Sequence, residues 1–441
     1  MYFARLIAIL NFVVSASAHS AVFMVNVTDL DLPDTNLGLA GCDVNEGMLG
    51  DQCTLRAAVM QANAGPGTDI ITLPDSESIF LNIPSLADDS SGAAHGDLDI
   101  TAPVIIFGIA PGEPTTGLAQ ILSSTGDRIF DISNSATVSM IGFALGGGTA
   151  FGRGGAVFVR SGQVTLNTIA FVNNSALEGG ALAVSNSVGQ PDSNVIVINS
   201  SFFANEADNN GSEVFVANNS NLTIDSSSFH GVQSNDPDVS TIFIDLNAEV
   251  LIENTLINGT PAESEMAETT GIIANSPDRL IIRNSTLPDF TGNVLRINGL
   301  NPTDEVEIYN SILESESAVC SLSGDLSNAA LGYSYVSNIT CAAIHESDIV
   351  MGPIFLGPLE ILPDSVVRSR SPVFGSVVID AGFPIGGVSS NPNQPCLSTD
   401  QRGDMRPMDG DADGLAQCDL GAIEVQTNGN ALIFSDRFEN P

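Results

Sequence analysis

The sequence contains no lysine, and its 13 arginines face 52 acidic residues, which gives a net charge of −39. Affinity for nucleic acids comes mainly from cationic side chains that neutralise phosphates, so this balance argues against a nucleic-acid partner. Anionic lipid is repelled for the same reason. Small cations, Ca²⁺ in particular, are the natural partners of such a surface. The alternative is an acidic surface that only keeps an exported protein soluble.

Large aromatic residues are also scarce, because the chain has no tryptophan and only four tyrosines. Hydrophobic residues nevertheless make up 43% of the 441 residues, enough for a large core of aliphatic side chains and phenylalanine. Aromatic side chains that could stack on sugar rings are correspondingly few.

Long apolar runs occur only at the start of the chain. Arg5 precedes an apolar run from Leu6 to Val14, and Ala16-Ser17-Ala18 supplies small residues at the cleavage positions. This pattern predicts a signal peptide over residues 1–18. No later stretch reaches the 18 or so apolar residues of a membrane-spanning helix. We therefore expect no transmembrane segment after signal removal, and a secreted or cell-surface location.

The six cysteines fall into three local couples. Export makes disulfides possible, and six cysteines allow 15 connectivities. Sequential pairing is favoured because the couples lie far apart along what is predicted below to be an elongated fold. The spacings do not resemble CxxC zinc sites, and four histidines are too few to complete such sites. The expected disulfides are Cys42–Cys53, Cys320–Cys341 and Cys396–Cys418.

The middle of the chain repeats one short pattern. Alternating aliphatic residues lead to Asn or Asp, then to a small hydroxyl residue and an apolar residue, as in "VIVINSSFF" and "LIIRNSTL". Successive Asn or Asp positions lie 26 to 32 residues apart. A second alternating run follows in each unit, such as "AVFVR" from Ala156 and "TIFID" from Thr241. The marked positions are Asn167, Asn199, Asp225, Asn254, Asn284 and Asn310.

Alternation indicates strands, and two short strands per unit leave no room for a crossover helix. A propeller blade needs four strands in about 40 residues. The unit therefore fits one coil of a parallel β-solenoid whose coils stack about 4.8 Å apart. Asn tolerates left-handed backbone and can hydrogen-bond to its copy on the next coil, so the Asn column predicts a repeated turn.

The stretch "CTLRAAVMQANAGPGTDIITLP" stands in front of the repeats. Thr54 can cap a short amphipathic helix that Gly65 ends, and "DIITL" then begins the first coil. An open solenoid end exposes a bare strand and core, so we expect this helix to be a lid held by the Cys42–Cys53 bridge. The apolar face of the helix would contain Leu55, Ala58, Val59 and Ala62.

These motifs resemble known families. "CTLRAAVMQAN" is similar to the CSLREA domain of exported bacterial β-helix proteins, although Ala57 replaces the usual Glu that could partner Arg56. "GRGGAVFV" and "LEGGALAV" resemble the coils of polymorphic outer-membrane and pectate-lyase-like β-helices. The run from Ser369 to Glu424 is similar to a choice-of-anchor Q domain, with an insertion after Pro372.

The resemblance implies export to the bacterial surface or medium without an agreed chemistry. The fold it implies is all-β, a right-handed parallel β-helix with a short N-terminal capping helix and a C-terminal cap domain closed by a disulfide. The expected organisation is a signal peptide (1–18), a CSLREA-like segment with the helix (19–68), β-helix repeats (69–316), last coils and a disulfide loop (317–368), a choice-of-anchor Q-like domain (369–426) and a tail (427–441).

"DGDADG" places three carboxylates at alternate positions of a glycine-turned loop. Asp409, Asp411 and Asp413 correspond to positions 1, 3 and 5 of a calcium loop, which converge on one cation. The bidentate Glu of the twelfth position is missing, because Leu420 stands there. We expect a Ca²⁺ site, the alternative being a solvated acidic turn. Arg402-Gly403-Asp404 spells an RGD motif, but Arg402 and Arg406 are expected to pair with Asp400, Asp404 or Asp419 instead.

A polysaccharide lyase or hydrolase is the alternative function. Such enzymes need a base beside Ca²⁺ or two carboxylates across the scissile bond. Arg283 and Arg296 stand on neighbouring coils and could meet acids such as Asp289, or form exterior ion pairs. Asp97 and Asp99 share a strand face without an adjacent nucleophile. The favoured hypothesis is an exported, non-catalytic protein for adhesion, envelope structure or ligand binding, whose partner is a cell-surface polysaccharide or protein.

Overall fold

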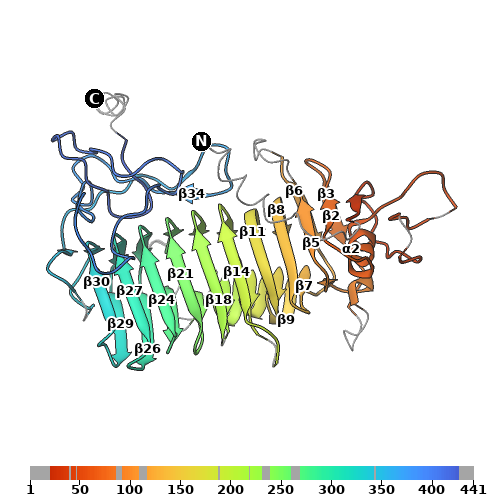
Figure 1. The fold of residues 1–441 in the computed structure, drawn as a ribbon, viewed down its shortest axis with the longest axis horizontal. Helices are drawn as coiled ribbons and strands as arrows, with labels where there is room; N and C mark the ends of the chain where they lie inside the picture. Colours follow the sequence, from red (N-terminus) through yellow and green to blue (C-terminus); the bar gives the residue numbers. More distant parts are fainter. Residues whose placement is uncertain are drawn as a thin grey trace.

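The computed structural model describes residues 20–426, apart from 39–40, 46, 86–91, 109–116, 187–188, 218, 231–238, 260–268 and 342–343. The predicted signal peptide and the C-terminal tail lie outside the described residues. Figure 1 shows an elongated stack of parallel strands with a helix at one end. The predicted all-β parallel solenoid is confirmed, because successive coils pair in parallel along the stack.

Each coil contributes strands to three faces, and the first two faces form one continuous 20-stranded sheet. The first face contains β1 (Val22–Met24), β2 (Asp69–Thr72), β5 (Val104–Phe107), the first halves of β8 (Ala136–Gly146) and β11 (Gly162–Val172), β14 (Ser193–Ile198), β18 (Ser220–Asp225), β21 (Glu249–Glu253), β24 (Arg279–Arg283), β27 (Glu305–Tyr309) and β30 (Ala329–Gly332).

The second face contains β3 (Ser78–Leu81), β6 (Ala119–Ser123), the second halves of β8 and β11, β15 (Ser201–Phe203), β19 (Ser228–His230), β22 (Leu256–Ile257), β25 (Thr286–Phe290), β28 (Ile312–Ser315), β31 (Tyr335–Val336) and β32 (Ile349–Val350). The third face is a nine-stranded parallel sheet of β4 (Leu98–Ile100), β7 (Phe130–Ile132), β10 (Val157–Val159), β13 (Leu182–Val184), β17 (Val214–Val216), β20 (Ser240–Ile244), β23 (Thr270–Asn275), β26 (Asn293–Leu300) and β29 (Ala318–Gly324).

Shorter elements complete the fold. They are the helix α2 (Leu55–Ala64), the 3₁₀ turn η1 (Gly92–Ala94), a three-stranded sheet of β9 (Thr149–Arg153), β12 (Ser175–Glu178) and β16 (Glu206–Asn210), and the pair β33 (Glu360–Ile361) and β34 (Arg368–Ser369). No helix among the residues described here combines the length and the apolar character that crossing a membrane requires.

Inward side chains form columns along the solenoid axis, as the alternation predicted. Val164, Val195 and Leu222 are in register on successive strands of the first face and are at most 2% exposed. Phe171, Phe202 and Phe229 stack below the second face, with ring centroids 4.5 and 4.4 Å apart. Offset stacking of aromatic rings adds to the stabilisation from burial alone. The core therefore runs the length of the solenoid.

The corner between the first and second faces corrects the predicted Asn column. Asn167 pairs in register with Ile198, and Asp225 pairs with the same Ile198, so both lie one residue before the turn. The turn position itself has positive φ in every coil from β8 to β30, a backbone that Asn tolerates better than most residues. This corner column contains Gly142, Thr168, Asn199, Ser226, Asn254, Asn284, Asn310 and Tyr333.

A ladder of buried hydroxyl groups follows the corner column. Each hydroxyl donates to the carbonyl two residues earlier and accepts the N–H of its counterpart on the preceding coil, as when Ser285 accepts from Thr255 at 3.2 Å. Buried polar groups are costly unless they are paired, and this ladder pairs them. The small hydroxyl residue of the sequence repeat thus has a structural role. The ladder contains Ser200, Ser227, Thr255, Ser285, Ser311 and Ser334.

The N-terminal cap forms as predicted. The Thr54 hydroxyl accepts the Ala57 N–H at 3.1 Å, and Gly65 follows the last helical residue. The predicted apolar residues of the helix are all buried. Arg56 finds its partner outside the helix, in Asp31, at 2.6 Å. All three expected disulfides are present.

The C-terminal segment, residues 353–426, does more than close the end of the solenoid. Figure 1 shows it in blue, running back over the later coils. Gln401 donates to the Ser227 carbonyl at 2.8 Å, and the Ala422 N–H donates to the Thr286 hydroxyl at 2.9 Å. Outward residues of the second face are consequently buried, including Ile312, which packs with Val378 and Leu420 of this segment.

Candidate functional site

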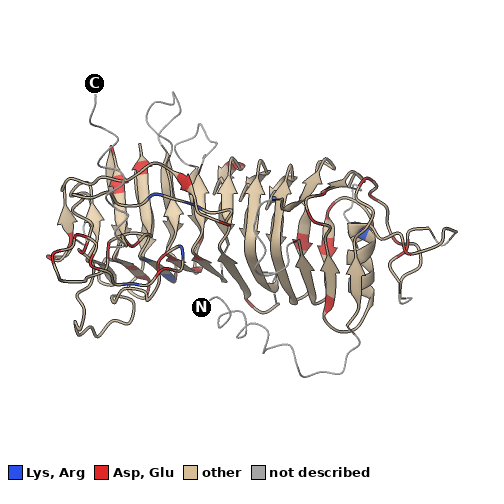
Figure 2. Cartoon of the chain, turned by 90° about the horizontal axis from the view of Figure 1, so that it is seen from above, with Lys and Arg blue, Asp and Glu red and all other residues tan. Residues whose placement is uncertain are grey.

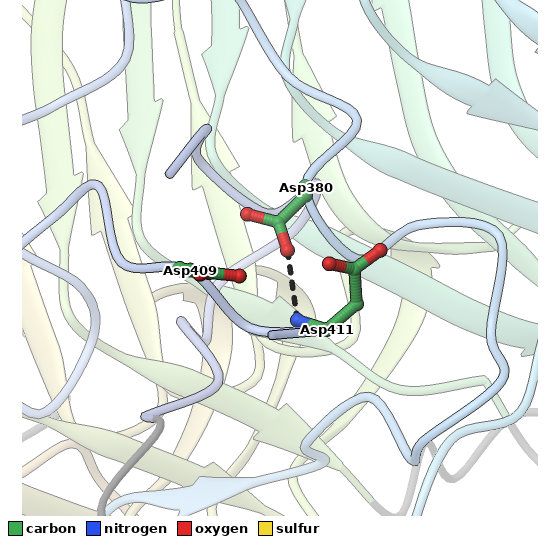
Figure 3. A group of neighbouring side chains, drawn as sticks. All are labelled: Asp380, Asp409 and Asp411. Carbon is green, nitrogen blue, oxygen red and sulfur yellow. Dashed lines mark hydrogen bonds between the residues drawn. The ribbon is translucent and has the colours of Figure 1, made fainter. Parts of the chain in front are cut away.

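An acidic group in the C-terminal segment brings together Asp380, Asp409 and Asp411. One carboxylate oxygen from each residue lies within 4.8 Å of the others. The Asp411 N–H donates to Asp380 Oδ2 at 2.9 Å, which ties the loop to the turn that carries Asp380 (Figure 3). Asp380 is in turn fixed by its own N–H, which donates to Asp419 Oδ1 at 2.8 Å. Burial raises the pKa of Asp380.

Asp413, the third predicted ligand, is not part of the acidic group. Its N–H donates to Asp409 Oδ1 at 3.1 Å and to Asp411 Oδ1 at 3.0 Å, which bends the loop. Its own Oδ1 accepts the N–H of Leu415 at 2.8 Å. The structure therefore joins two of the predicted ligands, and Asp380 contributes the third carboxylate from 31 residues away. Because Asp380 lies so far from the loop in the sequence, the spacing of the carboxylates could not identify it as a candidate ligand.

The donor set of the acidic group fits a hard cation. Ca²⁺ takes six to eight oxygen ligands, and carboxylates, carbonyls and water all qualify. The oxygens of Asp380 and Asp409 already accept N–H groups, but each carboxylate oxygen has two lone pairs and keeps one for a cation. Three carboxylates without a basic group in ion-pair contact, among the described residues, concentrate negative charge at one point. Asp380, Asp409 and Asp411 are therefore the residues that would hold Ca²⁺.

Asp419, whose carboxylate accepts the Asp380 N–H, belongs to a buried ion-pair network. Arg406 and Glu424 are paired at 3.2 Å with no exposed side-chain surface. Arg406 also donates to the carbonyls of Asp419 and Gly421. Burial raises the pKa of Asp419 to about 8, and the Glu424 carboxylate beside it acts in the same direction. The network fixes the backbone from which Asp380 is positioned.

The RGD motif belongs to the same network. Arg402 pairs with Asp400 at 2.7 Å and with Asp404 at 3.3 Å, as the sequence predicted. Both charged residues of the motif are thus engaged within the C-terminal segment.

A second cluster lies on the third face near the N-terminal end. Arg128 contacts Asp97 at 2.9 Å and Asp131 at 3.1 Å, and Arg160 contacts Asp131 at 2.7 Å. Arg160 also lies 4.0 Å from Asp99. Burial raises the pKa of Asp97 to about 8, against the opposing effect of Arg128. We call these five residues the third-face cluster.

Sequence reasoning found only part of the third-face cluster. It placed Asp97 and Asp99 on one strand face but missed Asp131, which is in register with Asp99 on the next coil. The sequence did contain a signal for Asp131, because two successive third-face strands, "LDI" and "FDI", each have an Asp at the middle position. The two arginines lie outside those strands.

Arg283 and Arg296 do not form a common site. Arg283 lies on the first face and pairs with Glu253, whereas Arg296 lies on the third face, in register with Ile273 and Ser321. Asp289 pairs with Arg370 of the C-terminal segment. Of the two alternatives, a common site with nearby acids is not formed, because the two strands belong to different faces, and Arg283 forms an ion pair instead. Figure 2 shows acidic residues along the length of the solenoid and few basic ones.

Comparisons with known proteins find similarity only among solved structures. No protein-family model matches the chain, and no curated protein matches it. Among solved structures, pectate lyase Pel9A aligns with a TM-score of 0.43 and 15% sequence identity, over 92% of this chain and 97% of that chain. The resemblances of the two end segments to the CSLREA and choice-of-anchor Q families therefore stay predictions.

Proposed function

We propose that the protein is an exported, non-catalytic solenoid that binds a cell-surface polysaccharide or protein along its side, with Ca²⁺ held by its C-terminal segment. Three disulfides favour an oxidising location outside the cytoplasm. The helix α2 covers one end of the stack, and residues 353–426 cover later coils of the second face. These covers reduce the open strand edges and bare core that would otherwise promote aggregation.

The observation that carries the proposal is the part of the first face that stays accessible, from β8 to β21. Its outward side chains stand in straight columns on parallel strands, for example Thr137, Gln163 and Asn194 in register on β8, β11 and β14. These residues are polar and at least partly exposed. Regularly spaced polar side chains on a rigid sheet suit a repetitive, extended partner. A polysaccharide chain meets that description.

The test combines binding with turnover. The purified protein is applied to an array of bacterial surface polysaccharides and plant polyuronates, with Ca²⁺ or with a chelator, and the same polymers are assayed for unsaturated products and new reducing ends. We expect saturable binding to at least one polymer and no products. Sustained product release would overturn the non-catalytic proposal, and the absence of any polymer or protein ligand would overturn the binding role.

One observation favours the second candidate, a Ca²⁺-dependent polysaccharide lyase or hydrolase. A carboxyl group with a pKa of about 8, such as Asp97, keeps its proton at neutral pH and can act as a general acid. Asp131 stands nearby as a second carboxylate, joined to Asp97 through Arg128. Against this role, the Asp97 side chain is only 1% exposed. If turnover is found, Asp97→Asn should abolish it.

A further inference from the structure

A small pocket lies where the C-terminal segment meets the first face. Its floor consists of outward side chains from β18, β21 and β24, and Asn393 of the C-terminal segment forms one wall. The volume is about 230 Å³. This is below the roughly 300–1,000 Å³ of sites for drug-sized ligands, so the pocket suits one small cyclic unit. None of its residues belongs to the acidic group or to the third-face cluster.

The wall is fixed independently of any ligand. Asn393 donates to Glu307 Oε2 at 2.6 Å, and Asn391 donates to the other oxygen of the same carboxylate. Glu307 is 5% exposed and lies on β27, one coil beyond the floor. The Leu397 N–H also donates to Asn284 Oδ1 at 3.1 Å, which anchors the same stretch of chain to the corner column. The pocket is therefore preformed, and binding need not order its wall.

The floor has two columns of different chemistry. Asn221, Glu249 and Arg279 are in register on successive strands and form a polar column. Thr223, Leu251 and Ile281 form the adjacent column on the same face, and it is largely aliphatic. A pyranose ring has the matching asymmetry, with hydroxyl groups at its edge and C–H groups on its face. Amide, carboxylate and guanidinium groups together supply both donors and acceptors to hydroxyl groups.

The charges around the pocket decide which sugar fits. Arg279 stands in register between Glu249 and Glu305, and its guanidinium lies 3.0 Å from the Glu305 carboxylate. The single cation is thus flanked by two anions, in a chain whose net charge is −39. A uronate or sulfated unit would add a third negative charge close to Glu249 and Glu305. A neutral unit meets no such repulsion.

We infer that this pocket binds one neutral pyranose unit of a polysaccharide. The inference rests on the proposed binding function and names its ligand class. Because the pocket opens on the first face, the rest of the polymer can continue over that face toward β14 and β11. The C-terminal segment thereby acquires a role in recognition, since Asn393 completes the site.

The test uses the full chain and two substitutions of the same kind. Thr223→Trp fills the pocket, and Thr149→Trp places the same side chain at an exposed position of β9, outside the first face. Far-ultraviolet circular dichroism and melting temperature should agree between the two variants. Binding is measured on an array of neutral glycans and polyuronates, and then by titration calorimetry with the neutral oligosaccharide that binds best. We expect Thr223→Trp to lose at least tenfold in affinity and Thr149→Trp to stay within twofold of the parent.

Each other outcome has a definite meaning. Unchanged neutral-glycan binding by Thr223→Trp would overturn the pocket and leave the proposed function standing. Preferential binding of polyuronates would overturn the assignment of a neutral sugar. Binding to a protein partner without any glycan binding would overturn this inference alone, and the absence of every ligand would overturn the proposed function together with it.

Discussion

Asn310 and Phe383 lie 73 residues apart, yet the Phe383 N–H donates to Asn310 Oδ1 at 2.8 Å. Asn310 also donates through its amide nitrogen to the Gln394 carbonyl at 2.8 Å. The same side chain that suits a left-handed corner thus joins the solenoid to its C-terminal segment. In the later coils the corner column is a docking site as well as a turn.

Replacing Asn310 with alanine should therefore cost more than replacing an equivalent corner residue. Asn199 has nearly the same φ as Asn310, 50° against 51°, but its amide bonds to Asn167 within the solenoid. Both substitutions lose about 1–2 kcal/mol from left-handed backbone strain. Asn310→Ala should lose about 1–3 kcal/mol more, because the buried Phe383 N–H and the half-buried Gln394 carbonyl lose their partner. Urea unfolding, with limited proteolysis of the C-terminal segment, checks the difference. Equal losses would contradict the docking role.

Calcium binding should raise the melting temperature, because a ligand that binds only the folded state stabilises it. Asp380→Asn and Asp411→Asn should each remove most of that gain. Asp413→Asn is the matched control, since its carboxylate lies outside the acidic group. Differential scanning fluorimetry in Ca²⁺ and in chelator measures the effect. If Asp413→Asn reduced the Ca²⁺-dependent gain in melting temperature more than Asp380→Asn, the calcium loop predicted from the sequence would be supported instead.

The coil period could be predicted because aliphatic alternation and small hydroxyl residues repeat along the chain. At Asn167 and Asp225 the turn was predicted one residue too early, because Asn or Asp can precede a left-handed turn as well as occupy it. The course of the C-terminal segment could not be predicted, because it has no period to align. Asp380 was missed for the same reason. Its contact with the Asp411 loop depends on tertiary packing.

Stability should depend on pH through Glu213, which is fully buried and accepts a hydrogen bond from Asn205. Burial raises its pKa from 4.5 to about 8, against the opposing hydrogen bonds from Asn205. Between those values the unfolded chain loses this proton while the folded protein keeps it. The free energy of unfolding should therefore fall as pH rises through this window, by about 1.4 kcal/mol per pKa unit of the shift.

The Glu213→Gln variant isolates this effect from other groups with raised pKa, such as Asp97 and Asp419. It should show a smaller decline in stability between pH 5 and pH 8 than the parent protein. Glu206→Gln, in the same coil but exposed, is the control and should leave the decline unchanged. Urea unfolding at several pH values provides the measurement. Parallel profiles for the parent and Glu213→Gln would show that Glu213 ionises normally in the folded state.

The Arg56–Asp31 pair should be the most sensitive ion pair of the N-terminal cap. Both side chains are at most 1% exposed, and Arg56 also donates to the carbonyls of Ala93 and Gly96. Asp31 in turn accepts the N–H groups of Asn82 and Ile83. Removing one partner of a buried pair leaves an uncompensated charge, which typically costs about 3–5 kcal/mol. Arg56→Met should lose stability on that scale.

Arg279→Met is the control for Arg56→Met. The side chains of Arg279 and its partner Glu305 are 43% and 40% exposed. Exposed ion pairs of this kind contribute about 0–1 kcal/mol to stability. The double variant Arg56→Met with Asp31→Asn should lose less than the sum of its single changes, because the stranded charge is gone. Urea unfolding of the parent, the three single variants and the double variant measures all of these differences. Additive losses, or equal losses in Arg56→Met and Arg279→Met, would mean that the buried pair does not hold the helix over the end of the core.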